Sequence, residues 1–538
     1  MTETRAPSAA QALPLSAPRQ QGVDARGVQA FLDAVEASAA IEPHSLMLLR
    51  HGHVVAEGWW APFSRDRLHL LYSLSKSFTS TALGLAVEEG LVSLDDTVLS
   101  HFPELDAEVT DERSRRMLVR HVAAMASGHR EETLDRVLAL DPRNPVRGFL
   151  LLPPDEEPGT VFAYNQPCTY TVASIVTQRT GSGLTDYLRP RLLDPLGIGE
   201  VAWHGDHTGM ELGFSGLHAT TEAIARLGQL YLQRGRWGDE QLVPEAWVEE
   251  ATRGHVRSDG QGRPVDWSQG YGFQFWMSRH GYRGDGAYGQ FCLVLPEQDA
   301  VLAMTAATEA MQEVLDAAWE YLLPAMGEMP DGTGGEAGPG GGGERGAADN
   351  GARAAAEDAA DDGPRDAAED ADAALAARLA ALTLPGVPGD TAPPSAEAWL
   401  DLRTERSSGP VAVSLATSRV TTSADDEGPG SGRWVVELEA DDGAVQLRTE
   451  VTGPSWQVHD VDLAAVAGDG ARLPVAVSGG WVGERLRLDL AFVETPHRLA
   501  IEVDGATREV SSRWLTEPLG TPPLRDLRAQ VVSGSARL

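Results

Sequence analysis

Residues 71–80 read Leu71-Tyr-Ser-Leu-Ser-Lys-Ser-Phe-Thr-Ser80. They contain the motif Ser-x-x-Lys, formed by Ser73 and Lys76 at the start of a helix predicted over residues 75–89. Residues three apart share a helix face, so the two side chains point to one place. A neutral lysine at that place takes the serine proton, and the alkoxide attacks a carbonyl carbon.

The lysine count favours this interpretation over a chance match, which Ser-rich segments often produce. Lys76 is the only lysine among 44 Lys and Arg residues. Arginine stays protonated in proteins, whereas a lysine loses its proton when its pKa is lowered. A solitary lysine in an Arg-rich chain therefore indicates a task that arginine cannot perform, such as general base catalysis.

Four further segments follow in an order that points to one family. They are Arg120-His-Val-Ala-Ala-Met-Ala-Ser-Gly128, Pro158-Gly-Thr-Val-Phe-Ala-Tyr-Asn165, Gly213-Phe-Ser-Gly-Leu-His-Ala-Thr220 and Gly286-Ala-Tyr-Gly-Gln290. With the Ser-x-x-Lys helix, they resemble the motifs of the β-lactamase-related serine hydrolases. This is the class C β-lactamase, D-amino-acid peptidase and esterase group of the penicillin-binding-protein superfamily. The resemblance covers about residues 28–324 and implies an α+β, β-lactamase/transpeptidase-like fold.

The resemblance implies that Tyr164 lies beside the Ser/Lys pair and relays protons to the leaving group. A phenol beside a cationic lysine is expected to have a lowered pKa and to act as acid or base. The family pattern Tyr-x-Asn here ends in Gln166, whose amide takes the position that contacts a substrate carbonyl. A tyrosine packed in the core is the alternative for Tyr164.

The third family motif, Lys-Thr-Gly, reads Gly284-Asp-Gly286 in this chain. Asp285 replaces a lysine that usually pairs with a substrate carboxylate, so an anionic group there is disfavoured by like charge. Gly286 permits close approach of the substrate to the strand. The resemblance implies an oxyanion hole made by the N–H groups of Ala287 and Ser73, each worth about 3–4 kcal/mol.

Other polar groups are interpreted as structural. The pair His51-Gly-His53 brackets a hairpin turn, and a solvated turn is favoured over a metal site. His129 is favoured as a loop residue over a substrate contact. The group Glu494-Thr-Pro-His497 has no nucleophile nearby and is interpreted as a structural corner. Two cysteines are too few for a disulfide framework, so buried free thiols are expected, with no metal and no cofactor.

Composition along the 538 residues predicts five segments. Short apolar runs separated by Gly, Asp and Pro in the C-terminal part predict a β-sandwich or barrel. A Gly- and Asp-rich stretch before it has too little apolar surface to fold, apart from a helix expected over 372–384. The expected segments are a disordered tail (1–27), the β-lactamase-like hydrolase domain (28–326), an acidic linker with that short helix (327–395), a small β domain (396–518) and a C-terminal tail (519–538).

The charge balance limits the partners. Lys and Arg total 44 against 79 Asp and Glu, a formal charge of −35. This argues against nucleic acid and against anionic membrane surfaces, both of which need clustered positive charge. No apolar run of about 18 residues and no secretory signal is found, so the expected compartment is the cytoplasm. Oligomerisation stays open.

The sequence therefore predicts a serine hydrolase that forms an acyl-enzyme on a small ester, amide or peptide substrate. Esters are favoured because their leaving groups need less protonation. A β-lactamase or D-amino-acid peptidase is the enzymatic alternative, although the lost Lys of the third motif argues against it. A non-catalytic binding protein on a hydrolase scaffold is the alternative of another class, with the second β domain as its best support.

Overall fold

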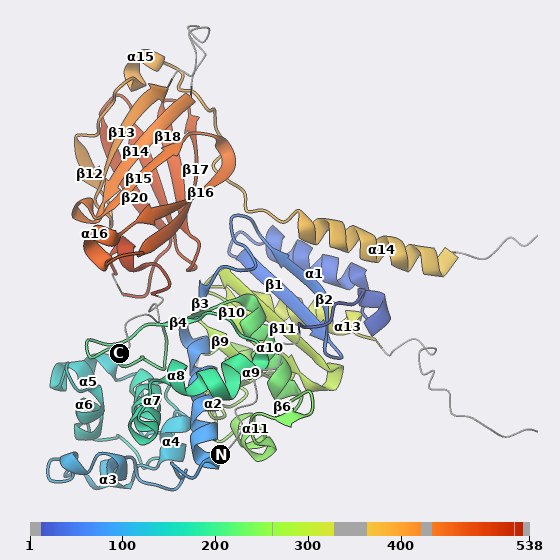
Figure 1. Cartoon of the computed structure of the whole chain (residues 1–538), viewed down its shortest axis with the longest axis vertical. Helices are drawn as coiled ribbons and strands as arrows, with labels where there is room; N and C mark the ends of the chain where they lie inside the picture. Colours follow the sequence, from blue (N-terminus) through green and yellow to red (C-terminus); the bar gives the residue numbers. More distant parts are fainter. Residues whose placement is uncertain (1–11, 261, 328–362, 421–432, 521, 531–538) are drawn as a thin grey trace, which may run out of the picture.

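The computed structural model describes residues 12–260, 262–327, 363–420, 433–520 and 522–530. Two parts are visible in Figure 1: an α+β part drawn in blue to yellow, and an all-β part drawn in orange and red. The α+β part itself combines a sheet covered by helices with a helical region beside it. This is the α+β architecture, with a separate all-β region, that the sequence predicted.

A six-stranded antiparallel sheet forms the centre of the α+β part. In spatial order its strands are β2 (His53–Trp59), β1 (Glu42–Arg50), β11 (Ala300–Ala307), β10 (Gln290–Leu295), β9 (Tyr282–Gly286) and β8 (Trp276–Met277). Strands from both ends of this part pair at its middle, with Leu46 opposite Met304. Because β1 and β11 are buried over nearly their whole length, the sheet is covered on both faces.

Alternate residues of β1 enter two different cores. Met47 and Leu49 belong to the core that also contains helices α2 (Ser75–Glu88) and α10 (Thr221–Leu232). Leu46 and Leu48 belong to the core that contains α1 (Ala25–Ala37) and α12 (Met311–Ala317). This alternation follows from the two-residue period of a strand.

The helical region packs against the side of α2 that faces away from the central sheet. Its helices are α3 (Glu112–Arg116), α4 (Val119–Ala123), α5 (Leu134–Leu140), α6 (Pro145–Leu151), α7 (Gln166–Thr180) and α8 (Leu184–Leu188). Helix α2 contacts α7 and α8 of this region, and every residue from Ser75 to Ala86 is buried. A separate short sheet contains β3 (His69–Leu70), β5 (Leu217–Ala219) and β4 (Ala202–Trp203), in that spatial order. Helix α2 therefore lies between the sheet and the helical region.

The all-β part is a sandwich. One sheet contains β12 (Arg406–Ser408), β20 (Glu509–Thr516), β19 (Arg498–Asp504), β18 (Arg485–Phe492), β17 (Arg472–Val482) and β16 (Gly453–Asp462), and the other contains β13 (Val413–Val420), β14 (Arg433–Ala440) and β15 (Val445–Glu450). Their facing side chains form one core, in which Val436 and Leu438 meet Leu488 and Ile501. Trp399 and Trp481 are buried there.

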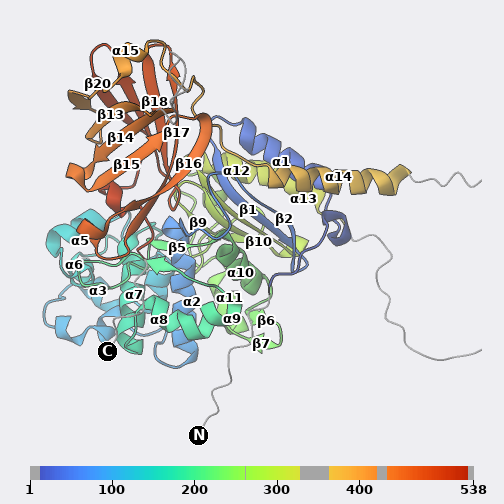
Figure 2. The same ribbon diagram turned by 45° about the horizontal axis from the view of Figure 1, so that its top comes forward.

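The sandwich rests on the end of the α+β part where β5 and β9 lie (Figure 2). Ala476, Ala491 and Val493 of the sandwich join the core that contains α1. Arg498 of β19 pairs with Glu42 of β1 and, at 2.6 Å, with Asp489 of β18. The two parts are therefore joined by an apolar contact with a nearly buried ion pair.

The N-terminal segment differs from the disordered tail that its composition predicted. Residues 1–11 lie outside the described residues, but residues 14–16 pair with the edge strand β2, and a 3-10 turn over Pro18–Gln21 follows them. The Val54 N–H donates to the Pro14 carbonyl at 2.8 Å, and the Ser16 N–H donates to the Val54 carbonyl at 3.0 Å. Backbone groups on an edge strand are free to pair whatever the partner's side chains, which composition does not reveal.

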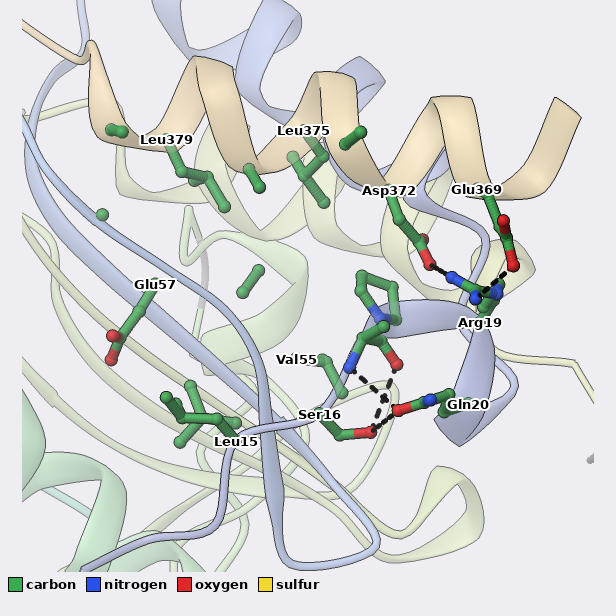
Figure 3. A pocket seen from close by; sticks show the side chains of 18 of the residues that line it. Leu15, Ser16, Arg19, Gln20, Val55, Glu57, Glu369, Asp372, Leu375 and Leu379 are labelled. Carbon is green, nitrogen blue, oxygen red and sulfur yellow. Dashed lines mark hydrogen bonds and ion pairs between the residues drawn. The ribbon is translucent and has the colours of Figure 1, made fainter. Parts of the chain in front are cut away.

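The expected linker also contains more structure than predicted. Residues 328–362 lie outside the described residues, but α14 spans Gly363–Ala380, starting and ending earlier than the helix predicted over 372–384. Figure 3 shows Leu375 and Leu379 of this helix facing a cavity of about 890 Å³ that Leu15 and Val55 also line. Arg19 pairs with Glu369 at 2.6 Å, so the acidic charge of this stretch is partly offset by the N-terminal segment.

The expected C-terminal tail is partly docked. Leu524 and Leu527 enter the core of the sandwich, and Ala529 packs on Leu68 and Ala202 of the α+β part. Residues 531–538 lie outside the described residues. None of the described helices is both long and apolar enough to cross a lipid bilayer.

Candidate active site

The predicted nucleophile lies in a turn tied to the small sheet. A single 3-10 turn, Tyr72–Leu74, precedes α2 and carries Ser73. The Ser75 hydroxyl donates to the Tyr72 carbonyl at 2.5 Å and accepts from the Leu217 N–H at 3.0 Å. The Leu71 N–H donates to the Leu217 carbonyl at 2.8 Å. These bonds fix the turn against β5, while Ser73 itself stays partly exposed.

The structure brings Ser73 and Lys76 together, as the helical spacing predicted. Lys76 Nζ lies 3.0 Å from Ser73 Oγ and donates to the Phe214 carbonyl at 2.7 Å. The lysine side chain is 1% exposed. Phe214 lies in the Gly213–Thr220 segment, so one of the quoted motifs supplies the carbonyl that orients the amine.

Burial makes the Lys76 amine a base near neutrality. Removal from water disfavours the ammonium and lowers the pKa of Lys76 to about 7, against opposing effects of Glu132 and Asp285. A general base works best when its pKa lies near the operating pH. Lys76 has that property because α2 is enclosed on both sides.

Tyr164 points its ring at the same place. Lys76 Nζ lies 4.8 Å from the centroid of the Tyr164 ring. The ring stacks on Trp276 at 5.2 Å and meets Tyr271 edge-on at 6.0 Å. Trp276 and Tyr271 are themselves buried. Tyr164 is thus held by aromatic contacts beside the Ser/Lys pair.

The pKa of Tyr164 moves in the opposite direction from the one expected from a cationic lysine. Burial and the nearby Asp285 raise it, and a hydrogen bond with the Ser73 side chain only partly opposes them. The expectation was wrong because desolvation exceeds any effect of the amine. Tyr164 is therefore a protonated phenol, suited to donating a proton or a hydrogen bond.

Gly286 ends strand β9 at a point of very close backbone contact. A Cβ there would lie 2.0 Å from the Leu71 carbonyl oxygen and 3.1 Å from the Leu74 nitrogen. The glycine is therefore required by the nucleophile turn itself, in addition to any approach of substrate. Ala287 follows it, partly buried against Leu70, Tyr72 and Tyr288.

Asp285 does not present an unbalanced negative charge. Its carboxylate accepts from Arg283 Nε at 2.9 Å, and both side chains are nearly buried, at 6% and 0% exposure. Burial raises the pKa of Asp285, while Arg283 and Lys76 oppose that rise. The expected repulsion of anions is therefore reduced, because the arginine two residues earlier on the strand faces the same way.

Gln166 begins α7 beside an acidic residue. Its N–H donates to Glu132 Oε2 at 3.1 Å, and its side-chain Oε1 is buried without a partner among the described residues. Asn165 is fully buried, and its side chain accepts from the N–H and the hydroxyl of Thr133, both at 2.9 Å. Asn165 therefore holds a loop, whereas Gln166, the next residue, is partly exposed.

Sequence reasoning missed Glu132 and Arg283. Glu132 acts on the Lys76 pKa from a loop that follows the Ser127-Gly128 turn, and no motif marks it. Arg283 carried a weak signal, since it shares a strand face with Asp285. His129 is buried and bonded to Ser127 at 3.0 Å, which favours the loop interpretation.

Both cysteines are buried free thiols, as expected. Burial raises the pKa of Cys168 to about 12 and that of Cys292 to about 12, so neither is a nucleophile at neutral pH. Within the described part of the chain, His, Cys, Asp and Glu side chains form no group of three or more that could hold a metal ion.

Known proteins match about half of this chain. The 6-aminohexanoate-dimer hydrolase of Paenarthrobacter ureafaciens is 27% identical over 282 residues, which cover 48% of this chain and 71% of that protein. Two solved structures cover the same region. A putative 6-aminohexanoate-dimer hydrolase from Bacillus anthracis matches at 19% identity and a TM-score of 0.47, covering 58% of this chain and 87% of that one. A family VIII carboxylesterase matches at 15% identity and a TM-score of 0.44, covering 57% and 99%.

The family assignment rests on a family model. The model for beta-lactamase matches residues 28–326, more than half of the chain and the whole region that contains the Ser/Lys pair. The chain therefore belongs to the beta-lactamase family.

Proposed function

We propose that this protein is a serine hydrolase that cleaves a small ester or amide through an acyl-enzyme, with Ser73 as nucleophile. The observation that carries the proposal is the 3.0 Å distance between Lys76 Nζ and Ser73 Oγ, with the amine buried and its pKa lowered to about 7. Ser73, Tyr164, Gln166 and Ala287 are each partly exposed, so a small substrate can reach the nucleophile.

The side chains divide the steps between them. Lys76 takes the Ser73 proton as Oγ bonds to the carbonyl carbon, and the oxyanion is held by the N–H groups of Ser73 and Ala287. Tyr164 gives a proton to the leaving group as its bond to carbon breaks. A water molecule then attacks the acyl carbonyl and gives a proton to the Tyr164 phenolate, and the Lys76 ammonium returns its proton to Ser73 Oγ as the acyl–oxygen bond breaks. Gln166 contacts the substrate carbonyl region, and no metal or cofactor takes part.

Amides and esters are both supported as substrate classes. The name of the Paenarthrobacter relative points to a short amide. The retained third-motif position carries the Asp285–Arg283 pair instead of a free cation, which disfavours β-lactams and D-peptides with a carboxylate there. We therefore expect slow hydrolysis of a chromogenic cephalosporin relative to small esters and amides.

The test is intact-mass analysis after treatment with a fluorophosphonate, on wild type and Ser73→Ala. One adduct on wild type that is absent from Ser73→Ala is the expected result. No adduct on folded wild type would overturn the proposal and favour the alternative of a binding protein. Screening of p-nitrophenyl esters, p-nitroanilides and a 6-aminohexanoate dimer then separates esterase from amidase activity.

A further inference from the structure

A loop of the sandwich contacts the nucleophile turn. Residues 493–497 join β18 to β19, and the Glu494 carbonyl accepts the Leu70 N–H at 2.8 Å. His497 Nε2 lies 2.6 Å from the Tyr72 hydroxyl. Tyr72 immediately precedes Ser73, so a residue more than 400 positions away in the chain touches the nucleophile's neighbour.

A second tyrosine lies next to the other proposed oxyanion donor, on its C-terminal side. Tyr288 immediately follows Ala287, and its hydroxyl donates to the carbonyl of Glu517, directly after β20. The rings of Tyr72 and Tyr288 lie 5.5 Å apart, and the His497 ring meets both nearly at right angles, at 5.8 and 5.5 Å. One imidazole of the sandwich therefore packs on both residues that border the oxyanion hole.

Both tyrosines have strained backbones. Their φ angles are 47° for Tyr72 and 67° for Tyr288, a region that bulky residues rarely occupy. Such a conformation costs about 1–3 kcal/mol and persists only where the surroundings hold it in place. The peptide between Tyr72 and Ser73 carries the Ser73 N–H, so the backbone conformation of Tyr72 sets the direction of that group. The conformation of Tyr288 orients the 287–288 peptide, which directly follows the one that carries the Ala287 N–H.

The hydrogen bonds fix the tautomer of His497. Its Nδ1 lies 3.2 Å from the Thr516 carbonyl, which can only accept, so Nδ1 carries the proton. Nε2 is then an acceptor, and the Tyr72 hydroxyl donates to it. Burial lowers the pKa of His497 to about 3, so this arrangement persists across the pH range in which Lys76 titrates.

We propose that His497 of the sandwich is a positioning residue for hydrolysis: it holds Tyr72 and Tyr288 so that the N–H groups of Ser73 and Ala287 converge on the oxyanion. This inference rests on the proposed function. It assigns the sandwich a role in completing the active site, where the sequence indicated only a structural corner. His497 touches neither substrate nor nucleophile and acts through the two tyrosines.

The test compares full-length wild type with His497→Phe and Tyr72→Phe. His497→Phe keeps a ring but loses the acceptor, and Tyr72→Phe loses only the hydroxyl. A misplaced oxyanion donor costs about 10- to 100-fold in rate. We expect each variant to lower kcat for a p-nitrophenyl ester, and the rate of fluorophosphonate labelling, by that factor, with KM within about twofold of wild type.

Three further variants separate positioning from general damage. The double variant is expected to lose no more than either single one, because both remove the same bond. His497→Gln restores an acceptor and is expected to recover part of kcat. His459→Phe is the matched control, since it removes an imidazole that bonds Thr449 at 3.0 Å elsewhere in the sandwich, and its kcat is expected to equal that of wild type.

The outcomes distinguish this inference from the proposed function. Wild-type labelling and turnover rates in folded His497→Phe would overturn the role of His497 and leave the serine hydrolase intact. If His497→Phe does not fold, an unchanged kcat in Tyr72→Phe overturns the role instead. Absence of any adduct at Ser73 in wild type would overturn the proposed function and this inference together.

Discussion

Gly286 of β9 and Leu71 of the nucleophile turn are packed backbone against backbone, so that a Cβ on the glycine would lie 2.0 Å from the Leu71 carbonyl oxygen. The strand that carries one proposed oxyanion donor is thereby joined directly to the turn that carries the other. The position of the hole depends on this contact between segments more than 200 residues apart.

Replacing this glycine is expected to damage both stability and activity. In Gly286→Ala the new methyl group forces β9 away from the turn, and overpacking of this kind costs about 1–3 kcal/mol. We expect a lower unfolding midpoint in urea and a loss of kcat of about 100-fold. Gly199→Ala is the control, because nothing lies within 4 Å of a Cβ there. Wild-type kcat in Gly286→Ala would contradict the assigned role of this contact.

Lys76→Arg keeps the positive charge and removes the base. A guanidinium stays protonated at any working pH, so it cannot accept the Ser73 proton. We expect kcat to fall by about 10²–10⁴-fold, the usual contribution of a general base. The measurement is steady-state hydrolysis of a p-nitrophenyl ester from pH 6 to 9, with circular dichroism as the check on folding. Activity above a tenth of wild type would exclude Lys76 as the base.

The pH profile reports the protonation of Lys76. The neutral amine is the active form, so kcat/KM is expected to rise with pH through about 7, where the lowered pKa of Lys76 lies. Glu132 raises that pKa by stabilising the ammonium. In Glu132→Gln the pKa is expected to fall further, which moves the rising limb to lower pH. A limb that stays in place, or moves to higher pH, would contradict the assignment of this limb to Lys76.

Tyr164→Phe separates the phenol from its ring. The phenylalanine ring keeps the contacts with Trp276 and Tyr271, so the free energy of unfolding is expected to change by less than about 1 kcal/mol. Loss of the proton donor is expected to lower kcat by about 10²–10⁴-fold. Because protonation of the leaving group matters more for amides, we expect the larger loss with a p-nitroanilide than with a p-nitrophenyl ester. Equal losses for both would argue against proton transfer to the leaving group.

Asp285→Asn tests the buried ion pair. Removing one partner leaves the buried Arg283 charge without the carboxylate that bonds its Nε, and breaking a buried ion pair in this way costs about 3–5 kcal/mol. We expect a decrease of that size in the free energy of unfolding measured in urea. Glu112→Gln is the control, since it breaks an exposed pair with Arg116 whose side chains are 78% and 55% accessible, and the expected change is below about 1 kcal/mol. A neutral effect of Asp285→Asn would show that Arg283 finds another partner.

The sequence by itself determined the Ser73–Lys76 pair, because a spacing of three on a helix places two side chains together whatever surrounds them. The α+β architecture was implied by the resemblance of several ordered motifs to one family, and the β region was predicted from short apolar runs separated by Gly, Asp and Pro. The sequence predicted a disordered tail where residues 14–16 pair with an edge strand, and it misplaced the bounds of helix α14, because pairing and docking with distant segments order both. Composition reports how much apolar surface a segment can bury, not whether a neighbouring edge strand accepts it.

Only the tertiary structure decided the electrostatics and the supports of the site. The lowered pKa of Lys76 and the raised pKa of Tyr164 depend on enclosure by the sheet and the helical region, which no local pattern contains. The contact between Tyr72 and His497 joins residues 425 positions apart. Burial and Coulomb effects act through space, so they are set by how distant segments pack, whereas motif spacing acts along the chain.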